Sequence, residues 1–266
     1  MKIALAQIAI EGGDVGSNRK RAAAAIESAA DRGADLVALP EIFNVGYFAF
    51  DTYQRNAEAL DGPTLTQMSD LADENDIAVL AGSIVEDLSL TDGETPADKG
   101  LANTSAFFDR DGERRAVYRK HHLFGYESAE AEMLVPGESL GIVEFEDVTV
   151  GMTTCYDLRF PELYREIAEA GATLVLVPSA WPYPRVEHWQ VLSRARAIEN
   201  QCFLATINGS GSYEDATLIG RSTVYDPWGT LLASTGDEPD IVVREIDPTR
   251  VEQVRESFPA WHDRRR

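Results

Sequence analysis

The chain has 266 residues, 44% of them apolar, which is enough to bury a substantial core in one large domain or two small ones. Its 45 acidic and 24 basic residues give a formal net charge of -21. Such a charge repels nucleic acid and anionic membrane surfaces, so it excludes both as partners. The two cysteines, Cys155 and Cys202, are too few for a disulfide framework and fit a reducing compartment.

The N-terminal residues run directly into an alternating apolar stretch, with no basic segment, long apolar segment or cleavage site of a secretory signal. The longest purely apolar runs, such as 174–178, are far shorter than the roughly 20 residues that a membrane-spanning helix needs. We therefore expect a cytoplasmic protein without membrane attachment. No cysteine or histidine cluster has zinc-ligand spacing, so we expect no metal and no cofactor.

The first part of the chain alternates between strand and helix patterns. The expected elements are, in order, strand 2–8, helix 18–30, strand 35–39, helix 64–75 and strand 77–85. Pro40 stops the third of these elements, and a polar loop rich in Gly, Pro and Asp follows the last one at 89–100.

The rest of the chain adds hairpins to this pattern. Its expected elements are strands 104–108 and 115–119 joined at Asp111-Gly112, strand 148–154, helix 161–170, strand 173–177, helix 186–200, strands 203–207, 222–225, 230–234 and 241–246, and a short helix with an extended end in the tail 251–266. No linker or internal repeat interrupts this order. The pattern predicts a single α/β domain over 1–266, with mixed sheets and helices outside them.

Three reactive side chains each follow a predicted strand directly. Glu41 comes after strand 35–39, Lys120 after strand 115–119, and Cys155 after strand 148–154. Loops beyond the carboxyl ends of strands are where open α/β sheets carry their chemistry. Taken singly, such residues are more often a solvated carboxylate, a surface charge and a small buried hydrophobe. Their joint occurrence is what makes a shared site worth considering.

These residues lie in segments that resemble the nitrilase, or carbon-nitrogen hydrolase, superfamily. The segments are 39–43 (LPEIF), 118–124 (YRKHHLF) and 154–162 (TCYDLRFPE), with further similar stretches at 177–181 (VPSAW), 188–200 and 226–229 (DPWG). Members of this superfamily carry a catalytic Glu, Lys and Cys, which implies these roles for Glu41, Lys120 and Cys155. The resemblance also implies a four-layer α-β-β-α sandwich, commonly dimerised through one helical face, and hence a homodimer or larger homo-oligomer.

The chemistry of this superfamily needs these residue types. A thiol with a pKa near 8.5 is mostly protonated at neutral pH, so a base or a neighbouring cation must favour the thiolate. We expect Glu41 to accept the proton of Cys155, and Lys120 with the backbone N–H of Tyr156 to stabilise the oxyanion, an interaction worth roughly 3 to 4 kcal/mol. Glu41 then protonates the departing nitrogen and activates water against the thioester. The prediction is an amidase that converts a small linear carboxamide into a carboxylate and ammonia.

The resemblance implies a second glutamate in the segment after Lys120. Residues 125–132 (GYESAEAE) offer Glu127, Glu130 and Glu132. We select Glu127, because members with a Glu-Ser pair at this place look similar, and keep Glu130 as the reserve. The stretch 155–162 also resembles members that act on small ω-amides and deaminated glutathione.

The expected substrate-binding residues are Tyr156, Arg159, Ser179, Trp181 and Glu130. Arg159 serves either as an ion-pair partner of an acidic loop or as a guide for a substrate carboxylate. Trp181 either lines the pocket or packs.

Two neighbouring histidines invite a different assignment. His121 and His122 follow Lys120 directly and allow a Cys-His interpretation, although His122 is more typical of a residue that supports the loop.

Other activities use the same three groups. A nitrilase or an N-carbamoyl amide hydrolase needs the same Glu, Lys and Cys, and an N-acyltransferase differs only in that an amine intercepts the thioester. A non-catalytic scaffold is disfavoured because the Glu, Lys and Cys set is intact.

The basic residues are unevenly divided, because lysine occurs only at positions 2, 20, 99 and 120 and the other 20 of the 24 are arginines. An acidic surface poor in lysine is typical of proteins from a cytoplasm with very high salt. At molar ionic strength, charges are screened over about 3 Å, which removes the repulsion among the protein's own carboxylates. The hypothesis is a halophilic source, against the alternative of an ordinary acidic enzyme.

We predict that the free energy of unfolding rises between low and molar potassium chloride, because salt screens the repulsion among the excess carboxylates. Urea unfolding followed by circular dichroism at both salt concentrations measures this difference. Equal stability at the two concentrations would exclude the halophilic hypothesis.

Overall fold

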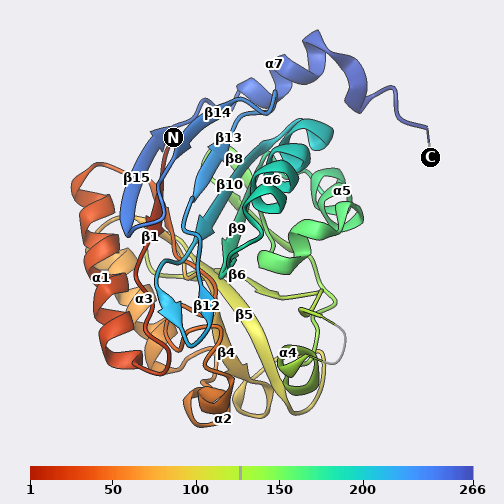
Figure 1. The fold of residues 1–266 in the computed structure, drawn as a ribbon. Helices are drawn as coiled ribbons and strands as arrows, with labels where there is room; N and C mark the ends of the chain where they lie inside the picture. Colours follow the sequence, from red (N-terminus) through yellow and green to blue (C-terminus); the bar gives the residue numbers. More distant parts are fainter. Residues whose placement is uncertain (126–127, 266) are drawn as a thin grey trace.

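The computed structural model describes residues 1–125 and 128–265 and contains two mixed sheets packed face to face between layers of helices (Figure 1). The first sheet has the order β15 (Asp240–Glu245), β1 (Lys2–Gln7), β2 (Leu36–Ala38), β3 (Ala78–Leu80), β5 (Leu101–Phe108) and β4 (Ile84–Asp87), and β6 (Arg114–Arg119) also pairs with β5. The second has the order β14 (Leu231–Ser234), β13 (Thr223–Tyr225), β10 (Phe203–Asn208), β9 (Leu174–Ser179), β8 (Val148–Met152) and β7 (Gly141–Phe145).

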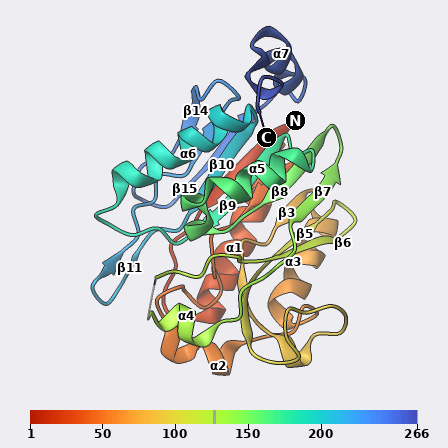
Figure 2. The ribbon, with the colours of Figure 1, turned by 90° about the vertical axis from the view of Figure 1, so that its right-hand side faces the viewer.

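Helices cover the outer face of each sheet. Helices α1 (Val15–Asp31) and α3 (Pro63–Glu74) lie against the first sheet, and α5 (Pro161–Glu169) and α6 (Val186–Asn200) lie against the second (Figures 1 and 2). Local sequence sets where these helices begin. The Asp14 side chain accepts the N–H of Ser17 at 3.1 Å, and α3 and α5 begin on proline, whose missing N–H costs nothing in a first turn.

The central strands read as continuous apolar runs because both of their faces are buried. In β1, Ile3 and Leu5 pack between the sheets, whereas Ala4 and Ala6 pack toward the helices. The other sheet alternates in the same way. The arrangement confirms the predicted four-layer α-β-β-α sandwich.

One predicted strand is wrong. The stretch 77–85 forms two short strands, β3 and β4, which both pair antiparallel with β5. The break lies at Gly82, whose φ is +35° and where a Cβ atom would lie 1.9 Å from the carbonyl oxygen of Pro40. This close approach lets the Ser83 hydroxyl accept the N–H of Ile42 at 2.8 Å, so the break supports the loop that carries Glu41.

Several short elements carry too few residues for their periodicity to be recognised in the sequence. They are β7, the hairpin of β11 (Ser212–Tyr213) and β12 (Ala216–Thr217), the helices α2 (Tyr53–Asn56) and α4 (Ala129–Met133), and the 3-10 turns η1 (Phe50–Thr52) and η2 (Leu88–Leu90). The strand expected over 148–154 also ends early, so Cys155 opens a 3-10 turn, η3 (Cys155–Arg159), with φ +47°. The tail contains α7 (Arg250–Ser257) and η4 (Pro259–Trp261).

Strand directions bring the three predicted reactive residues to one edge. β2 is parallel to β3, and β3 and β6 both run antiparallel to β5, so β2 and β6 end on the same side. In the second sheet, β8 and β9 are parallel. No helix among the described residues is long and apolar enough to cross a membrane.

Candidate active site

Glu41, Lys120 and Cys155 meet at this edge of the two sheets, although they come from three separate loops. The Lys120 Nζ atom lies 2.9 Å from Glu41 Oε1, and both side chains are fully buried. Cys155 is 8% exposed and opens onto a cavity. The structure therefore places the three predicted residues in one shared site.

Lys120 lies between two carboxylates. Its Nζ atom is 2.8 Å from Glu130 Oε1, in addition to the contact with Glu41, and it lies 5.2 Å from the centre of the Tyr47 ring. Burial acts to lower the pKa of Lys120, but the charges of Glu130 and Glu41 outweigh it and raise the pKa above its ordinary value. The ammonium is therefore permanently charged.

Backbone and side-chain donors hold Glu41. Its Oε1 accepts from Lys120 and from Asn103 Nδ2 at 2.9 Å, and its Oε2 accepts the N–H of Ala180, which follows β9 in the other sheet, at 2.9 Å. Burial raises the pKa of Glu41, and the charge of Glu130 adds to this, while Lys120 opposes both. Glu41 is thus a base whose proton affinity exceeds that of a solvated carboxylate.

The Cys155 thiol is protonated in the resting site. Burial raises its pKa well above the ordinary value, the negative charge of Glu41 raises it further, and Lys120 and the N–H of Ala180 oppose the shift. A preformed thiolate is therefore disfavoured. Glu41, which shares a hydrogen bond with the Cys155 thiol, is the carboxylate placed to take its proton.

The second carboxylate beside Lys120 is Glu130, which the sequence offered as the reserve. Its Oε2 accepts the Tyr47 hydroxyl at 2.9 Å and the N–H of Phe124, so all its contacts lie inside the protein. The preferred candidate, Glu127, lies outside the described residues. The third candidate, Glu132, is exposed on α4.

Asn103 belongs to the site but was missed by the sequence analysis. It lies on β5, its Nδ2 atom donates to Glu41 and lies 3.4 Å from Glu130, and its carbonyl accepts the N–H of Lys120 at 2.9 Å. Its Oδ1 atom is buried and has no hydrogen-bond partner among the described residues. The run of three polar residues Asn103, Thr104 and Ser105 in one buried strand was the signal that could have found it, because polar groups are buried only with partners.

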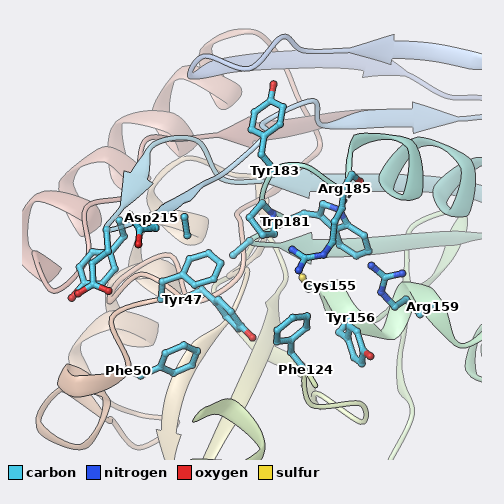
Figure 3. A pocket seen from close by; sticks show the side chains of 16 residues that line it. Tyr47, Phe50, Phe124, Cys155, Tyr156, Arg159, Trp181, Tyr183, Arg185 and Asp215 are labelled. Atoms are coloured by element: carbon cyan, nitrogen blue, oxygen red, sulfur yellow. Dashed lines mark hydrogen bonds between the residues drawn. The ribbon is translucent and has the colours of Figure 1, made fainter. Parts of the chain in front are cut away.

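The cavity above Cys155 has a volume of about 420 Å³. Its wall is largely aromatic and includes Tyr47, Phe124, Tyr156 and Trp181 (Figure 3). A cavity of this size accommodates a small molecule.

Two arginines enter the same cavity beside Cys155 (Figure 3). Arg159 stacks 4.8 Å from the centre of the Trp181 ring and lies 3.3 Å from His188 Nδ1, and Arg185 lies 5.7 Å from the centre of the Phe124 ring. Within residues 1–125 and 128–265, neither guanidinium has a carboxylate partner at ion-pair distance. The pocket lining therefore holds two guanidinium groups without an ion-pair partner among these residues, together with the carboxylates of Glu214 and Asp215.

Of the remaining predicted substrate contacts, two line the cavity and two do not. Tyr156 and Trp181 both line the cavity, and Trp181 also packs on Trp189, with ring centres 5.5 Å apart. Ser179 does not line it, because its hydroxyl donates to the carbonyl of Val177 at 3.1 Å. Glu130 likewise lies behind Lys120 and away from the cavity wall.

Comparison with known proteins agrees with this geometry. Residues 2–256 match the Carbon-nitrogen hydrolase family. The chain belongs to the carbon-nitrogen hydrolase family. It is 37% identical to a 2-oxoglutaramate amidase of Paenarthrobacter nicotinovorans over 87% of this chain and 79% of that protein. It is therefore an enzyme that hydrolyses amides.

Solved structures of this family have the same fold. Nit3 of Saccharomyces cerevisiae, a member of branch 10 of the nitrilase superfamily, has a TM-score of 0.88 and 32% identity, with 97% of this chain and 94% of that chain covered. A mutant amidase from Nesterenkonia sp. AN1 has a TM-score of 0.82 and 30% identity, with 98% and 99% covered, and in it acrylamide has added to the active-site cysteine.

We predict that Lys120→Met lowers the free energy of unfolding at neutral pH by about 3 to 5 kcal/mol, because two carboxylates stay buried without their cation. Losing Lys120 also raises the pKa of Glu41 further. A carboxyl whose folded pKa exceeds its unfolded value takes up a proton on folding, so the deficit shrinks as the pH falls through the folded pKa. Urea unfolding at neutral pH and at about pH 5 measures both effects.

The matched control is Lys99→Met, which removes an exposed lysine and should change stability by less than about 0.5 kcal/mol. A Lys120→Met deficit that stays constant on acidification contradicts the assignment of buried, uncompensated carboxylates.

Proposed function

We propose that this carbon-nitrogen hydrolase cleaves a small linear amide that carries a carboxylate at its far end, through a thioester on Cys155, and releases ammonia. The observation that carries the proposal is the cavity over Cys155, which has Glu41 and Lys120 behind the sulfur and unpaired Arg159 and Arg185 at its wall. The name of the related 2-oxoglutaramate amidase supports it, because 2-oxoglutaramate is a small linear amide with a terminal carboxylate.

The first half of the reaction forms the thioester. The thiol proton of Cys155 passes to Glu41 as Sγ attacks the amide carbon, and the carbonyl oxygen takes up the negative charge. The Lys120 ammonium and the backbone N–H of Tyr156 stabilise this oxyanion. The carbon-nitrogen bond then breaks, and the proton held by Glu41 leaves with the nitrogen as ammonia.

The second half consumes water. Glu41, again a carboxylate, takes a proton from a water molecule as the oxygen attacks the thioester carbon, and Lys120 stabilises the second oxyanion. The carbon-sulfur bond breaks, the proton returns to Cys155, and the acid product leaves. Glu130 acts as the second glutamate, because it neutralises Lys120 from behind and keeps the ammonium next to Glu41.

The arginines select the substrate. A carboxylate that enters the cavity finds the planar donors of Arg159 and Arg185, and this favours acidic amides over neutral ones. The cavity wall also includes Glu214 and Asp215, so the two arginines offset its acidic residues in a chain that carries a net charge of -21.

We predict that ammonia release is fastest with small amides that end in a carboxylate, tested against neutral amides, nitriles and N-carbamoyl compounds. Cys155→Ala should abolish turnover, while Cys202→Ala, which removes a buried cysteine away from the cavity, should retain it. Arg159→Gln and Arg185→Gln should each raise KM for the acidic amides by about 10- to 100-fold, as expected for a charge-assisted hydrogen bond.

Three outcomes would contradict the proposal. Turnover that persists in Cys155→Ala excludes the nucleophile, and a nitrile or N-carbamoyl compound as the best substrate excludes the amidase assignment. Amide products formed in the presence of added amines would indicate acyl transfer in place of hydrolysis.

We infer further that the chain forms a homodimer through the outer face of α6. Val191 and Ile198 on this helix are 60% and 48% exposed, and the exposed Trp228 and Phe258, with ring centres 5.8 Å apart, are further large apolar side chains of the second-sheet half. Helices α5 and α6 lie together on this outer layer (Figure 2). Exposed apolar side chains on one helix are typical of a protein-protein interface.

We predict twice the mass of one chain in sedimentation equilibrium, and a shift to the single-chain mass in the double variant Val191→Asp/Ile198→Asp, because buried unpaired charges oppose association. Leu90→Asp, at an exposed apolar residue of η2, is the control and should stay dimeric. A double variant that keeps the mass of the parent rules out this face.

A further inference from the structure

We propose that Asp157 is a positioning residue that holds Lys120 and Cys155 at their working separation, by binding the chain on both sides of Lys120 to the turn that carries Cys155. The inference rests on the proposed function, in which these two groups act on the same acyl carbon. Among the described residues, Asp157 does not line the cavity and has no hydrogen bond to the side chains of Glu41, Lys120 or Cys155, so it acts on the reaction through other residues.

A single carboxylate makes all the connections. Asp157 Oδ2 accepts the hydroxyl of Tyr118 at 2.6 Å and the N–H of Thr154 at 2.9 Å. Asp157 Oδ1 accepts the backbone N–H of His122 at 2.9 Å and lies 2.8 Å from His122 Nδ1. Because a carboxylate only accepts hydrogen bonds, this contact assigns the Nδ1 proton of His122.

The partners of Asp157 lie next to Lys120 and Cys155 in the sequence. Tyr118 and His122 stand two residues before and two residues after Lys120, at the end of β6 in the first sheet. Thr154 immediately precedes Cys155, in the segment that leaves β8 in the second sheet. Asp157 therefore bridges the two sheets at the points where the ammonium and the thiol emerge.

This bridge complements the one made by Glu41. Glu41 is attached to the second sheet through the N–H of Ala180. The Lys120 side chain, in contrast, donates to Glu41 and Glu130 and to no other residue that the structure describes. The Asp157 contacts supply the direct connection between the backbone around Lys120 and the backbone around Cys155.

The bridge is built to be rigid. The Asp157 side chain is fully buried and has four hydrogen-bond contacts, so its two oxygen atoms are both satisfied as acceptors. Burial and the charge of Asp157 raise the pKa of Tyr118 well above its ordinary value, which keeps the phenol a donor. The His122 ring stacks on Phe160, with ring centres 3.7 Å apart and planes at 9°, which fixes the edge that faces Asp157.

These contacts also explain the role of His122, the second histidine after Lys120. His122 does not line the cavity over Cys155, and its Nδ1 atom is occupied by Asp157. The geometry therefore gives His122 a supporting part in the bridge in place of a Cys-His dyad.

The decisive variant is Asp157→Asn, which keeps the shape of the side chain but presents an NH₂ group to donors that need an acceptor. We expect kcat to fall by about 10- to 100-fold with KM within about threefold of the parent, because sub-ångström misplacement of catalytic groups acts on the chemical step. Steady-state kinetics on the best acidic amide, across pH, measures both values.

The pH profile separates positioning from general loss of stability. Glu41 faces Lys120, Glu130, Cys155 and Tyr47, and of these groups only Lys120 lowers its pKa by charge. If Lys120 moves away in Asp157→Asn, the pKa of Glu41 rises, and the acidic limb of kcat moves to higher pH. Tyr118→Phe, which removes a single donor, should show a smaller shift in the same direction.

The matched control is Asp226→Asn. Asp226 is also a buried aspartate, and its Oδ1 accepts the N–H groups of Trp228 and Thr230 at 2.9 and 2.8 Å in the turn before β14, away from the cavity. The Asp226→Asn variant should have a lower free energy of unfolding than the parent, but the acidic limb of its kcat profile should stay at the same pH.

An Asp157→Asn variant that is folded and has the parent's kcat overturns the proposal. A loss of kcat without movement of the acidic limb also overturns it, because that result indicates a purely structural residue. If Asp157→Asn does not fold, Tyr118→Phe decides by the same two readouts.

Failure of the proposed function leaves a different signature. If the parent releases no ammonia from any amide, alkylation of Cys155 by iodoacetamide across pH still reports on the bridge. Lys120 lowers the pKa of Cys155, so its displacement in Asp157→Asn should move the alkylation profile to higher pH. An unchanged alkylation profile would again reject the bridge.

Discussion

The site depends on one buried ammonium held between two buried carboxylates. Lys120 lies 2.9 Å from Glu41 and 2.8 Å from Glu130, and none of the three side chains reaches solvent. Removing such charges from water is costly, and their attraction offsets the cost only where further hydrogen bonds complete each group. Asn103 donates a further hydrogen bond to Glu41, and Tyr47 donates one to Glu130. The loops that carry these residues must therefore keep one arrangement.

The same arrangement determines how the sulfur works. Burial raises the pKa of the Cys155 thiol, and the charge of Glu41 raises it further against the opposing charge of Lys120. In the proposed reaction, nucleophilicity therefore depends on proton transfer to Glu41 at the moment of attack. An oxyanion that forms next to the buried Lys120 ammonium in that reaction gains more than it would in water. Burying these charges lowers the stability of the fold, but it leaves the ammonium fixed where the proposed oxyanion forms.

The outer part of the site follows a different rule. The charges of Glu41, Lys120 and Glu130 are paired and buried, whereas Arg159 and Arg185 have no ion-pair partner within 1–125 and 128–265 and line an aromatic cavity that opens to solvent. In the proposed function, a substrate carboxylate is the partner that these guanidinium groups gain on binding, which suits them to selecting a substrate.

The sequence by itself determined most of the long elements, and its resemblance to a family singled out the central reactive groups. Helix 186–200 agrees with α6 residue for residue, because fifteen residues without Gly or Pro favour a helix whatever the tertiary context. Glu41, Lys120 and Cys155 were recognisable because their segments resemble those of carbon-nitrogen hydrolases. Tertiary structure alone decided that β3 and β4 separate at Gly82, that Glu130 reaches Lys120, that Asn103 joins the site and that Ser179 turns away from the cavity. Each of these depends on which distant backbone lies opposite a side chain. Periodicity along the chain carries no record of that, since contacts between the sheets join residues far apart in sequence.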